Sequence, residues 1–320
     1  MKHNRDWNKV SFFEIFTHGI IMGTINKLPG ISGGLYSLII GFYNHLISSI
    51  KSISYKNLKI LKTDGVKPFL RLINGNFLFF ISTGMIMSYF TTSKILDYFL
   101  IKNELYVWAV FFGLILGSLY ILIKRIKKTN INTAIFLFFG LIFGVFISVS
   151  DPLYENRNLL FIFFCGFISI CGITIPGLSG SFLLILLGNY KLLLVDSVNN
   201  FFNLISNFFY TSDQKLNVEN ELINILLVFF MGSVFGLVVL SKFLTYINDK
   251  FPNQLNHLII GFVIGTLSIV WPWNQIKNNI KPIELSNSLN SIAIVLILTG
   301  ILITVIINNY VDKENIRLNR

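Results

Sequence analysis

Long hydrophobic runs separated by short polar stretches fill this chain of 320 residues. A membrane-spanning helix needs roughly 20 apolar residues, and runs near that length predict six spans at about 77–98, 105–123, 133–149, 222–246, 255–273 and 290–309. Two further apolar stretches, 10–50 and 159–194, are each interrupted by a Pro-Gly pair, which should end a helix. We interpret each stretch as a re-entrant hairpin that enters and leaves the membrane on one side. The alternative is a pair of ordinary spans joined by a tight turn.

The interruption is a motif that occurs twice. Leu28-Pro29-Gly30-Ile31-Ser32-Gly33-Gly34 corresponds to Ile175-Pro176-Gly177-Leu178-Ser179-Gly180-Ser181, and each copy is followed by a Gly-x-Tyr sequence, at Gly41-Phe42-Tyr43 and Gly188-Asn189-Tyr190. Pro29 and Pro176 lie 147 positions apart, as do Tyr43 and Tyr190. Further along the chain, identical residues of the two copies lie 148 positions apart. They are Gly84 with Gly232, Ser93-Lys94 with Ser241-Lys242, and Gly113 and Gly117 with Gly261 and Gly265. Gly140 and Gly300 match after an insertion. The chain is therefore an internal duplication, with one repeat in 1–150 and the other in 151–320.

The positions of Lys and Arg predict the orientation of the spans. With both motifs in hairpins, one side of the membrane receives the segments 1–9, 51–76, 124–132, 242–256 and 310–320, which hold 18 of the 26 Lys and Arg residues. Basic loops stay cytoplasmic, so both termini are predicted to be cytoplasmic. Each half then crosses an odd number of times and the second half is inverted. The predicted fold is an all-α polytopic membrane protein, an inverted internal repeat of six transmembrane helices plus two re-entrant hairpins.

Composition supports a membrane protein and argues against other classes. Hydrophobic residues make up 53% of the chain and charged residues 13%, about half the charged share of soluble domains, with a mean hydropathy of +0.68. The net charge of +11 does not indicate nucleic acid, because no soluble segment is long enough to form a domain that binds it. The four histidines lack metal-ligand spacing. Gly30-Ile31-Ser32-Gly33-Gly34 has the letters of a Gly-x-Ser-x-Gly elbow, but the sequence offers no plausible base beside either motif. We therefore expect no enzyme activity, metal or cofactor.

The two motifs are the candidate site. Short apolar segments interrupted by Gly and Pro, at matching places in two inverted halves, indicate the midplane binding site of a transporter. Their glycines bring backbone N–H groups close to a ligand, and the helix that follows each motif attracts anions at its start. We predict that the loops form an anion cradle from Asn26, Lys27, Pro29, Gly30, Ser32, Gly33 and Gly34 in the first copy and Thr174, Pro176, Gly177, Ser179, Gly180 and Ser181 in the second. Tight helix packing and capping by the same small residues is the alternative.

Charged residues near the motifs have competing interpretations. Lys27 is a candidate phosphate contact, or it snorkels to the membrane interface. Glu14 and His18, spaced i,i+4, are candidates for a proton relay in ion-coupled transport, although a satisfied local pair is the favoured interpretation. Lys94 and Lys242 are repeat mates for which anchoring at a span end is favoured over function.

A further lysine follows the second hairpin. Lys191 is expected near the outer surface, either in contact with a lipid phosphate or in a solvated loop.

The paired motifs, with the Gly-x-Tyr sequence after each, resemble the PopT-type family of polyprenyl-phosphate (undecaprenyl-phosphate) translocases of bacterial membranes. The likeness covers nearly the whole chain. It implies a plasma-membrane protein whose partner is a polyprenyl phosphate, the lipid carrier of cell-envelope and peptidoglycan synthesis, returned from the outer to the inner leaflet. This chain departs from the family's first motif at three positions. The family commonly has an acidic residue where this chain has Asn26, a threonine where it has Leu35, and an acidic residue where it has Asn44.

Two other classes of function stay open from the sequence. A secondary transporter of a small anion or amino acid would use the same inverted loops, and a non-transporting membrane assembly protein would use them for packing. Transport by alternating access and transport along a groove that passes the head group are equally compatible with the sequence, which does not indicate an oligomeric state.

Overall fold

The computed structural model describes residue 7 and residues 10–53, 55–126, 129–149, 154–174, 178–209, 215–274 and 287–318. Every regular element in these ranges is a helix. The all-α prediction is confirmed for them. The chain divides into two compact units, which we call the first unit (Met1–Ile25, Gly33–Thr91 and Ile307–Arg320) and the second unit (Asn26–Ser32 and Thr92–Ile306).

The first unit contains the N-terminal helices. They are α1 (Phe12–Lys27, except for its last two residues), α2 (Gly33–Ile40), α3 (Tyr43–Lys51), α4 (Tyr55–Thr63), α5 (Val66–Leu72), the beginning of α6 (Gly75–Lys102) and the end of α15 (Asn287–Leu318). Within this unit α1 crosses α6 closely. A Cβ added to Gly84 of α6 would lie 2.2 Å from the Phe16 carbonyl oxygen of α1. Glycine is needed there because the two backbones are in contact.

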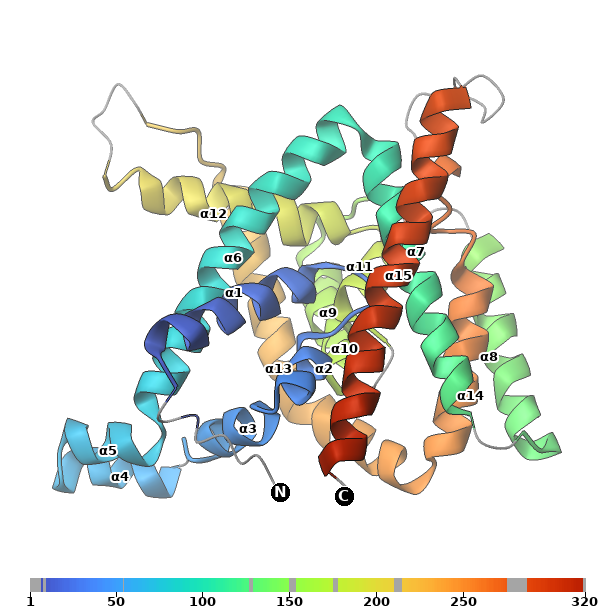
Figure 1. Ribbon diagram of the computed structural model, residues 1–320. Coiled ribbons are helices and arrows are strands. Elements are labelled where there is room, and N and C mark those ends of the chain that lie inside the picture. Colours follow the sequence, from blue (N-terminus) through green and yellow to red (C-terminus); the bar gives the residue numbers. More distant parts are fainter. Residues whose placement is uncertain are drawn as a thin grey trace. The chain divides into compact units, whose positions relative to one another are not determined.

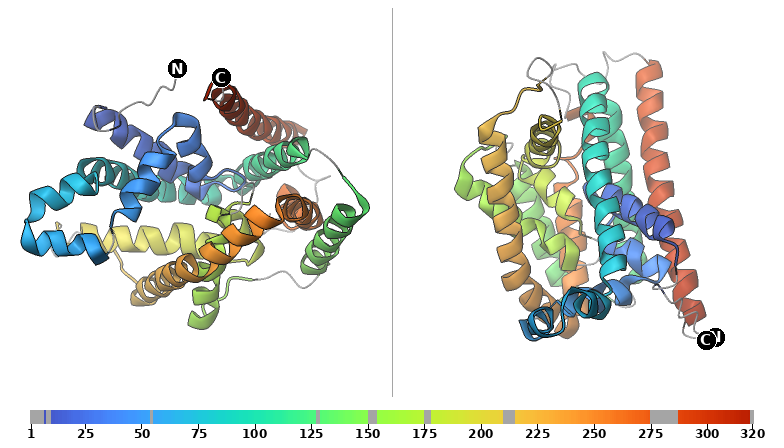
Figure 2. Two further views of the ribbon diagram at one scale, coloured as in Figure 1. Left: turned by 90° about the horizontal axis from the view of Figure 1, so that it is seen from below. Right: turned by 90° about the vertical axis from the view of Figure 1, so that its left-hand side faces the viewer.

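The second unit contains the remaining helices. They are the end of α6, α7 (Glu104–Arg125), α8 (Ile131–Val149), α9 (Leu159–Ser169), α10 (Cys171–Thr174), α11 (Gly180–Leu186), the π-helix η1 (Leu192–Asp196), α12 (Ser197–Ser206), α13 (Asn220–Lys250), α14 (Pro252–Thr266), the 3₁₀ turn η3 (Pro272–Asn274) and the beginning of α15. Helices α8 and α14 run side by side (Figures 1 and 2), as do α9 and α13.

Among the described residues, length and hydropathy identify four helices able to cross a membrane: Glu104–Lys124, Ile131–Val149, Asn220–Leu240 and Asn290–Asn309. A fifth is obtained if α5 and α6, bent by 73° at the break between them, count as one span. The predicted span 255–273 corresponds to α14, which has 15 residues and is about 22 Å long at ~1.5 Å per residue. It is shorter than the ~30 Å hydrocarbon core. The structure thus supports four or five of the six predicted spans among the described residues.

Both motifs interrupt helices, as the sequence predicts. Helix α1 ends at Lys27 and α2 begins at Gly33, while α10 ends at Thr174 and α11 begins at Gly180. The helices after the motifs also end alike, because Gly41 (φ +87°) and Gly188 (φ +72°) are both left-handed. Phe42 N–H then bonds the Ser37 carbonyl at 3.0 Å, and Asn189 N–H bonds the Leu184 carbonyl at 3.0 Å. That the segments are re-entrant is still a prediction.

Two polar stretches outside the predicted spans and hairpins contain helices. Residues 51–76 form α4 and α5, and the stretch from Asp196 to Glu221 begins with α12. Helix α12 forms because Val198 and Asn200 are buried, and the Asn200 side chain bonds the backbone of Glu219 in both directions, at 2.8 and 2.9 Å. Burial of one helix face overrides the polar composition of this segment.

Glycines at i,i+4 spacing define the helix crossings of the second unit. Gly140 and Gly144 of α8 meet Gly261 and Gly265 of α14, and an added Cβ at Gly261 would lie 2.0 Å from the Leu137 carbonyl oxygen. Gly232 and Gly236 of α13 face α9, and Gly113 and Gly117 of α7 face α15 in the same way. In lipid, such small residues allow the close backbone approach that holds helices together.

Gly261→Ala is expected to destabilise the protein by about 2 kcal/mol or more, because the methyl group forces α8 and α14 apart. By helix propensity alone, alanine in place of glycine would stabilise the helix by ~1 kcal/mol. A net loss of stability in this variant therefore reports the clash between the two helices. Thermal unfolding in detergent measures it. The control is Gly75→Ala in the first turn of α6, where the nearest atom is the flexible end of Leu70. Equal unfolding temperatures for the two variants would contradict the close crossing.

Candidate functional site

The first motif loop, residues 26–32, lies entirely in the second unit. Gly30 has φ +87°, and an added Cβ there would lie 2.6 Å from the Leu114 carbonyl oxygen of α7. The position therefore requires glycine twice, for its left-handed backbone and for its contact with α7. Pro29 is buried beside it, and Asn26 and Ser32 are half-buried.

The second motif loop lies in the same unit. Ser179 caps α11 by accepting a hydrogen bond from Phe182 N–H at 3.2 Å. Gly180 lies close to α9, where its added Cβ would be 2.5 Å from the Ser169 carbonyl oxygen. Two predicted site residues, Pro176 and Gly177, lie outside the described residues, and so does the side chain of Thr174.

Direct hydrogen bonds join the two loops. Gly30 N–H donates to Ser179 Oγ at 2.9 Å, and Ser181 Oγ donates to the Leu28 carbonyl at 3.0 Å. Ser179 and Ser181 are only 4% and 3% exposed. The structure thus brings Gly30, Ser179 and Ser181 together from sequence positions about 150 residues apart.

Lys27, the last residue of α1, is completely buried beside the loops. Its Nζ donates to Ser93 Oγ of α6 and, at 2.6 Å, to the Leu194 carbonyl of η1. Ser93 Oγ also donates to that carbonyl at 3.0 Å. The burial is incompatible with snorkelling to the interface. The Ser93 hydroxyl and the Leu194 carbonyl are both uncharged acceptors.

Two residues of this site were not among the sequence candidates. Tyr190 OH donates to the Lys27 carbonyl at 3.0 Å, and its ring packs edge-on against Phe111. Ser93 contacts Lys27 directly. Both had a sequence signal, since Tyr190 is the repeat mate of Tyr43 and Ser93 is the neighbour of Lys94.

The π-helix η1 presents its backbone to the lysine. Lys27 and Ser93 both bond the carbonyl of Leu194, in the middle of this five-residue π-helix. A single π-helical turn within an α-helical segment leaves carbonyls outside the usual ladder and often marks a functional position.

Four predicted residues lie in the first unit. Gly33 and Gly34 begin α2, where Ser37 Oγ bonds the Gly34 carbonyl at 2.7 Å. Glu14 and His18 lie on α1 with their side chains 3.7 Å apart, and His18 Nδ1 is hydrogen-bonded to Tyr36 OH at 2.7 Å. The side chains of Glu14 and His18 therefore lie next to each other on α1, and a proton relay through them stays a prediction.

Two of the remaining candidate lysines contact side chains outside the two loops. Lys94 is exposed, with Nζ 3.7 Å from the centre of the Phe202 ring. Lys191 is paired with Asp196 at 2.6 Å. Burial raises the pKa of the Asp196 carboxyl, and the hydrogen bond from Lys191 opposes that rise. The side chain of Lys242 lies outside the described residues.

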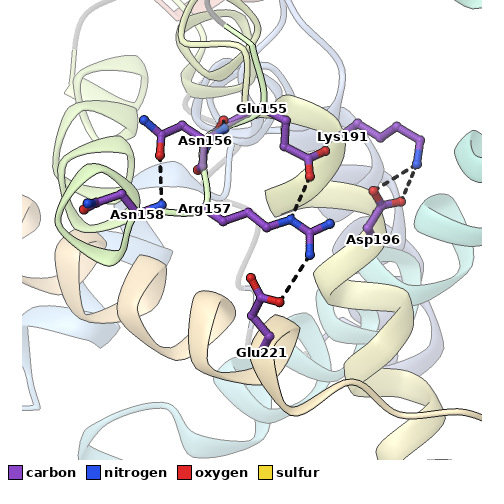
Figure 3. A network of polar contacts seen from close by, with 8 residues as sticks. Glu155, Asn156, Arg157, Asn158, Lys191, Asp196 and Glu221 are labelled. Atoms are coloured by element: carbon purple, nitrogen blue, oxygen red, sulfur yellow. Dashed lines mark hydrogen bonds and ion pairs between the residues drawn. The ribbon is translucent and has the colours of Figure 1, made fainter.

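Lys191 lies near a second charged contact (Figure 3). Arg157 bridges Glu155 at 3.0 Å and Glu221 at 3.4 Å, and the carboxylate of Glu155 is the main cause that raises the pKa of Arg157. The cations Arg157 and Lys191 are thus already paired with carboxylates, which weakens the case for Lys191 as a lipid-phosphate contact.

Comparison with known proteins identifies the relatives of this chain. The family described as undecaprenyl phosphate translocase-like matches residues 22–286. A polyprenyl-phosphate transporter of Vibrio cholerae serotype O1 is 28% identical, covering 95% of this chain and 98% of the relative. A polyprenyl-phosphate transporter of Staphylococcus aureus is also 28% identical, covering 79% of this chain and 84% of the relative. No solved structure matches. The matched region includes both motif loops and Lys27, and the chain belongs to the undecaprenyl phosphate translocase-like family.

Proposed function

We propose that this protein transports polyprenyl phosphate, specifically undecaprenyl phosphate, from the outer to the inner leaflet of a bacterial plasma membrane. Its family and the names of two relatives support the substrate class. One observation carries the proposal. Two Pro-Gly-x-Ser-Gly loops, far apart in the sequence, are hydrogen-bonded to each other beside a completely buried lysine.

A phosphate inside a membrane protein needs several donors at once, because an unpaired charge in an apolar environment costs many kcal/mol. Lys27 supplies the positive charge, and Ser93, Ser179 and Ser181 supply hydroxyl groups. The present partners of the lysine include a hydroxyl and a carbonyl. A phosphate oxygen competes well with such neutral acceptors, since a hydrogen bond between two ionised groups is about twice as strong.

In this proposal the head group passes through the loop pair while the polyprenyl tail stays in lipid between helices. The two repeats are inverted, so that one loop approaches from each side of the membrane, and both termini are cytoplasmic. The protein only moves its substrate and catalyses no reaction on it. Inverted symmetry suits such a task, because rocking of the two halves opens the site alternately to the two leaflets.

Liposomes that contain the purified protein are expected to move labelled polyprenyl phosphate between leaflets. The same lipid without its phosphate should not move, because the proposed site recognises charge. The measurement is the fraction of label accessible from outside over time, with empty liposomes as the control. Absence of protein-dependent movement, with and without a pH gradient, would refute the proposed substrate.

Lys27→Gln is expected to lower the transport rate at least tenfold, since a hydrogen bond to a charged group contributes about 1.5–3 kcal/mol. Glutamine still offers an N–H donor to Ser93 and Leu194, so the variant removes mainly the charge. The matched control is Lys94→Gln, which makes the same change at an exposed side chain of α6. The proposal predicts near-normal transport for the control. If both variants transport alike, Lys27 does not hold the phosphate.

Ser179→Ala is expected to slow transport and to lower the free energy of unfolding by about 1–2 kcal/mol. The substitution removes the cap of α11 and the acceptor of Gly30 N–H. Ser118→Ala is the control, because in the described part of the chain that buried hydroxyl bonds only the Ile115 carbonyl, within α7. The transport rate in liposomes and the thermal unfolding of the purified variant measure the loss of transport and the loss of stability separately. Wild-type transport in Ser179→Ala would show that the loop contact is not part of the pathway.

A further inference from the structure

The first unit carries a surface element with the properties of a membrane-interface hairpin. Helices α4 and α5 lie side by side (Figure 1), and α5 is bent by 73° from α6. Since α5 and α6 together qualify as a membrane span, a bend of this size turns α5 away from the span direction and towards the membrane plane. Helices that lie in this plane bury an apolar face and contact head groups with basic residues.

The hairpin has both kinds of residue on its surface. Three hydrophobic side chains of α5, Val66, Leu70 and Leu72, are exposed. The exposed basic residues of the same region are Lys51, Lys59, Lys62, Lys67 and Arg71. Asp64 is the one acidic residue in the sequence from 51 to 76. Such a surplus of cations next to apolar groups complements a membrane that contains anionic lipids.

A pocket of about 270 Å³ opens where this hairpin meets α6 and α1. Its lining includes Trp7, Phe12, Leu70, Arg71, Asn76 and Phe77. In the described part of the chain, the Arg71 guanidinium makes no hydrogen bond or ion pair. It therefore offers a planar set of donors that fits two oxygens of a phosphate. Asn76 is a second polar side chain in the lining.

We propose that this pocket binds the phosphate head group of an anionic phospholipid of the surrounding membrane, with Arg71 as the main contact. Phe12 and Leu70, which are 52% and 43% exposed, continue the pocket as an apolar surface on which the acyl chains lie. Trp7 is only 4% exposed and forms part of the pocket wall, where its indole N–H bonds the Gly41 carbonyl at 3.3 Å. The bound lipid fixes the hairpin to the membrane surface, and this role does not depend on the transported substrate.

Binding of phosphatidylglycerol to the full-length protein in detergent tests the proposal, measured by native mass spectrometry and by the rise in unfolding temperature. Phosphatidylglycerol is expected to bind and phosphatidylcholine to bind at least tenfold more weakly. Arg71→Gln should reduce phosphatidylglycerol affinity about tenfold, and Arg71→Lys should recover only part of it, because lysine lacks the planar fork. The side chain is exposed, so the unfolding temperature without lipid should not change.

The matched control is Lys62→Gln, which removes one positive charge from α4 at a residue outside the pocket lining. A specific head-group site predicts a much smaller loss for this variant than for Arg71→Gln. Equal losses would show diffuse attraction between the hairpin and the membrane, and the pocket would not be a site. Equal binding of phosphatidylcholine, or competition by millimolar inorganic phosphate, would also overturn the proposal.

Discussion

Backbone polar groups that leave a helix in an apolar environment must find hydrogen-bond partners, and this requirement determines the structure around the two loops. The first loop breaks α1, and three of its backbone groups are bonded by side chains at or beside the second loop. Tyr190, Ser181 and Ser179 bond the Lys27 carbonyl, the Leu28 carbonyl and the Gly30 N–H. Neither loop is therefore an independent element. A serine lost from the second loop leaves a buried backbone group of the first loop unpaired.

The buried lysine has a different status from these backbone bonds. Two of the acceptors of Lys27 Nζ are neutral, and a neutral acceptor offsets little of the cost of removing a full charge from water. Ionisable groups at such positions are costly, and they usually mark a substrate or ion pathway. A neutral side chain that donates hydrogen bonds would be enough to bond Ser93 and the Leu194 carbonyl. The cost of the charge therefore argues for a ligand that carries the opposite charge for part of the transport cycle.

The sequence predicted the features that depend on the local chain and missed those that depend on side-chain direction. Helix breaks at both motifs follow from Pro and Gly, and the contact between the loops was expected from their repetition. Lys94, in contrast, was a candidate from the sequence because it is charged and corresponds to Lys242 in the second repeat. Its neighbour Ser93 is the residue that contacts Lys27. Adjacent positions of a helix point about 100° apart, and only the packing of α6 against η1 decides which of them faces inward.

The glycines that match between the two sequence repeats lie where helices cross closely. Gly113 and Gly117 of α7 pack against α15, and their repeat mates Gly261 and Gly265 of α14 pack against α8. In each case the middle predicted span of one half contacts the last span of the other half. This exchange is the pattern that a pseudo-twofold relation between two halves produces, for parallel as well as for inverted repeats, so the inversion stays a prediction. Halves joined through such reciprocal crossings also bring one motif from each half to a common place, where the two loops bond each other.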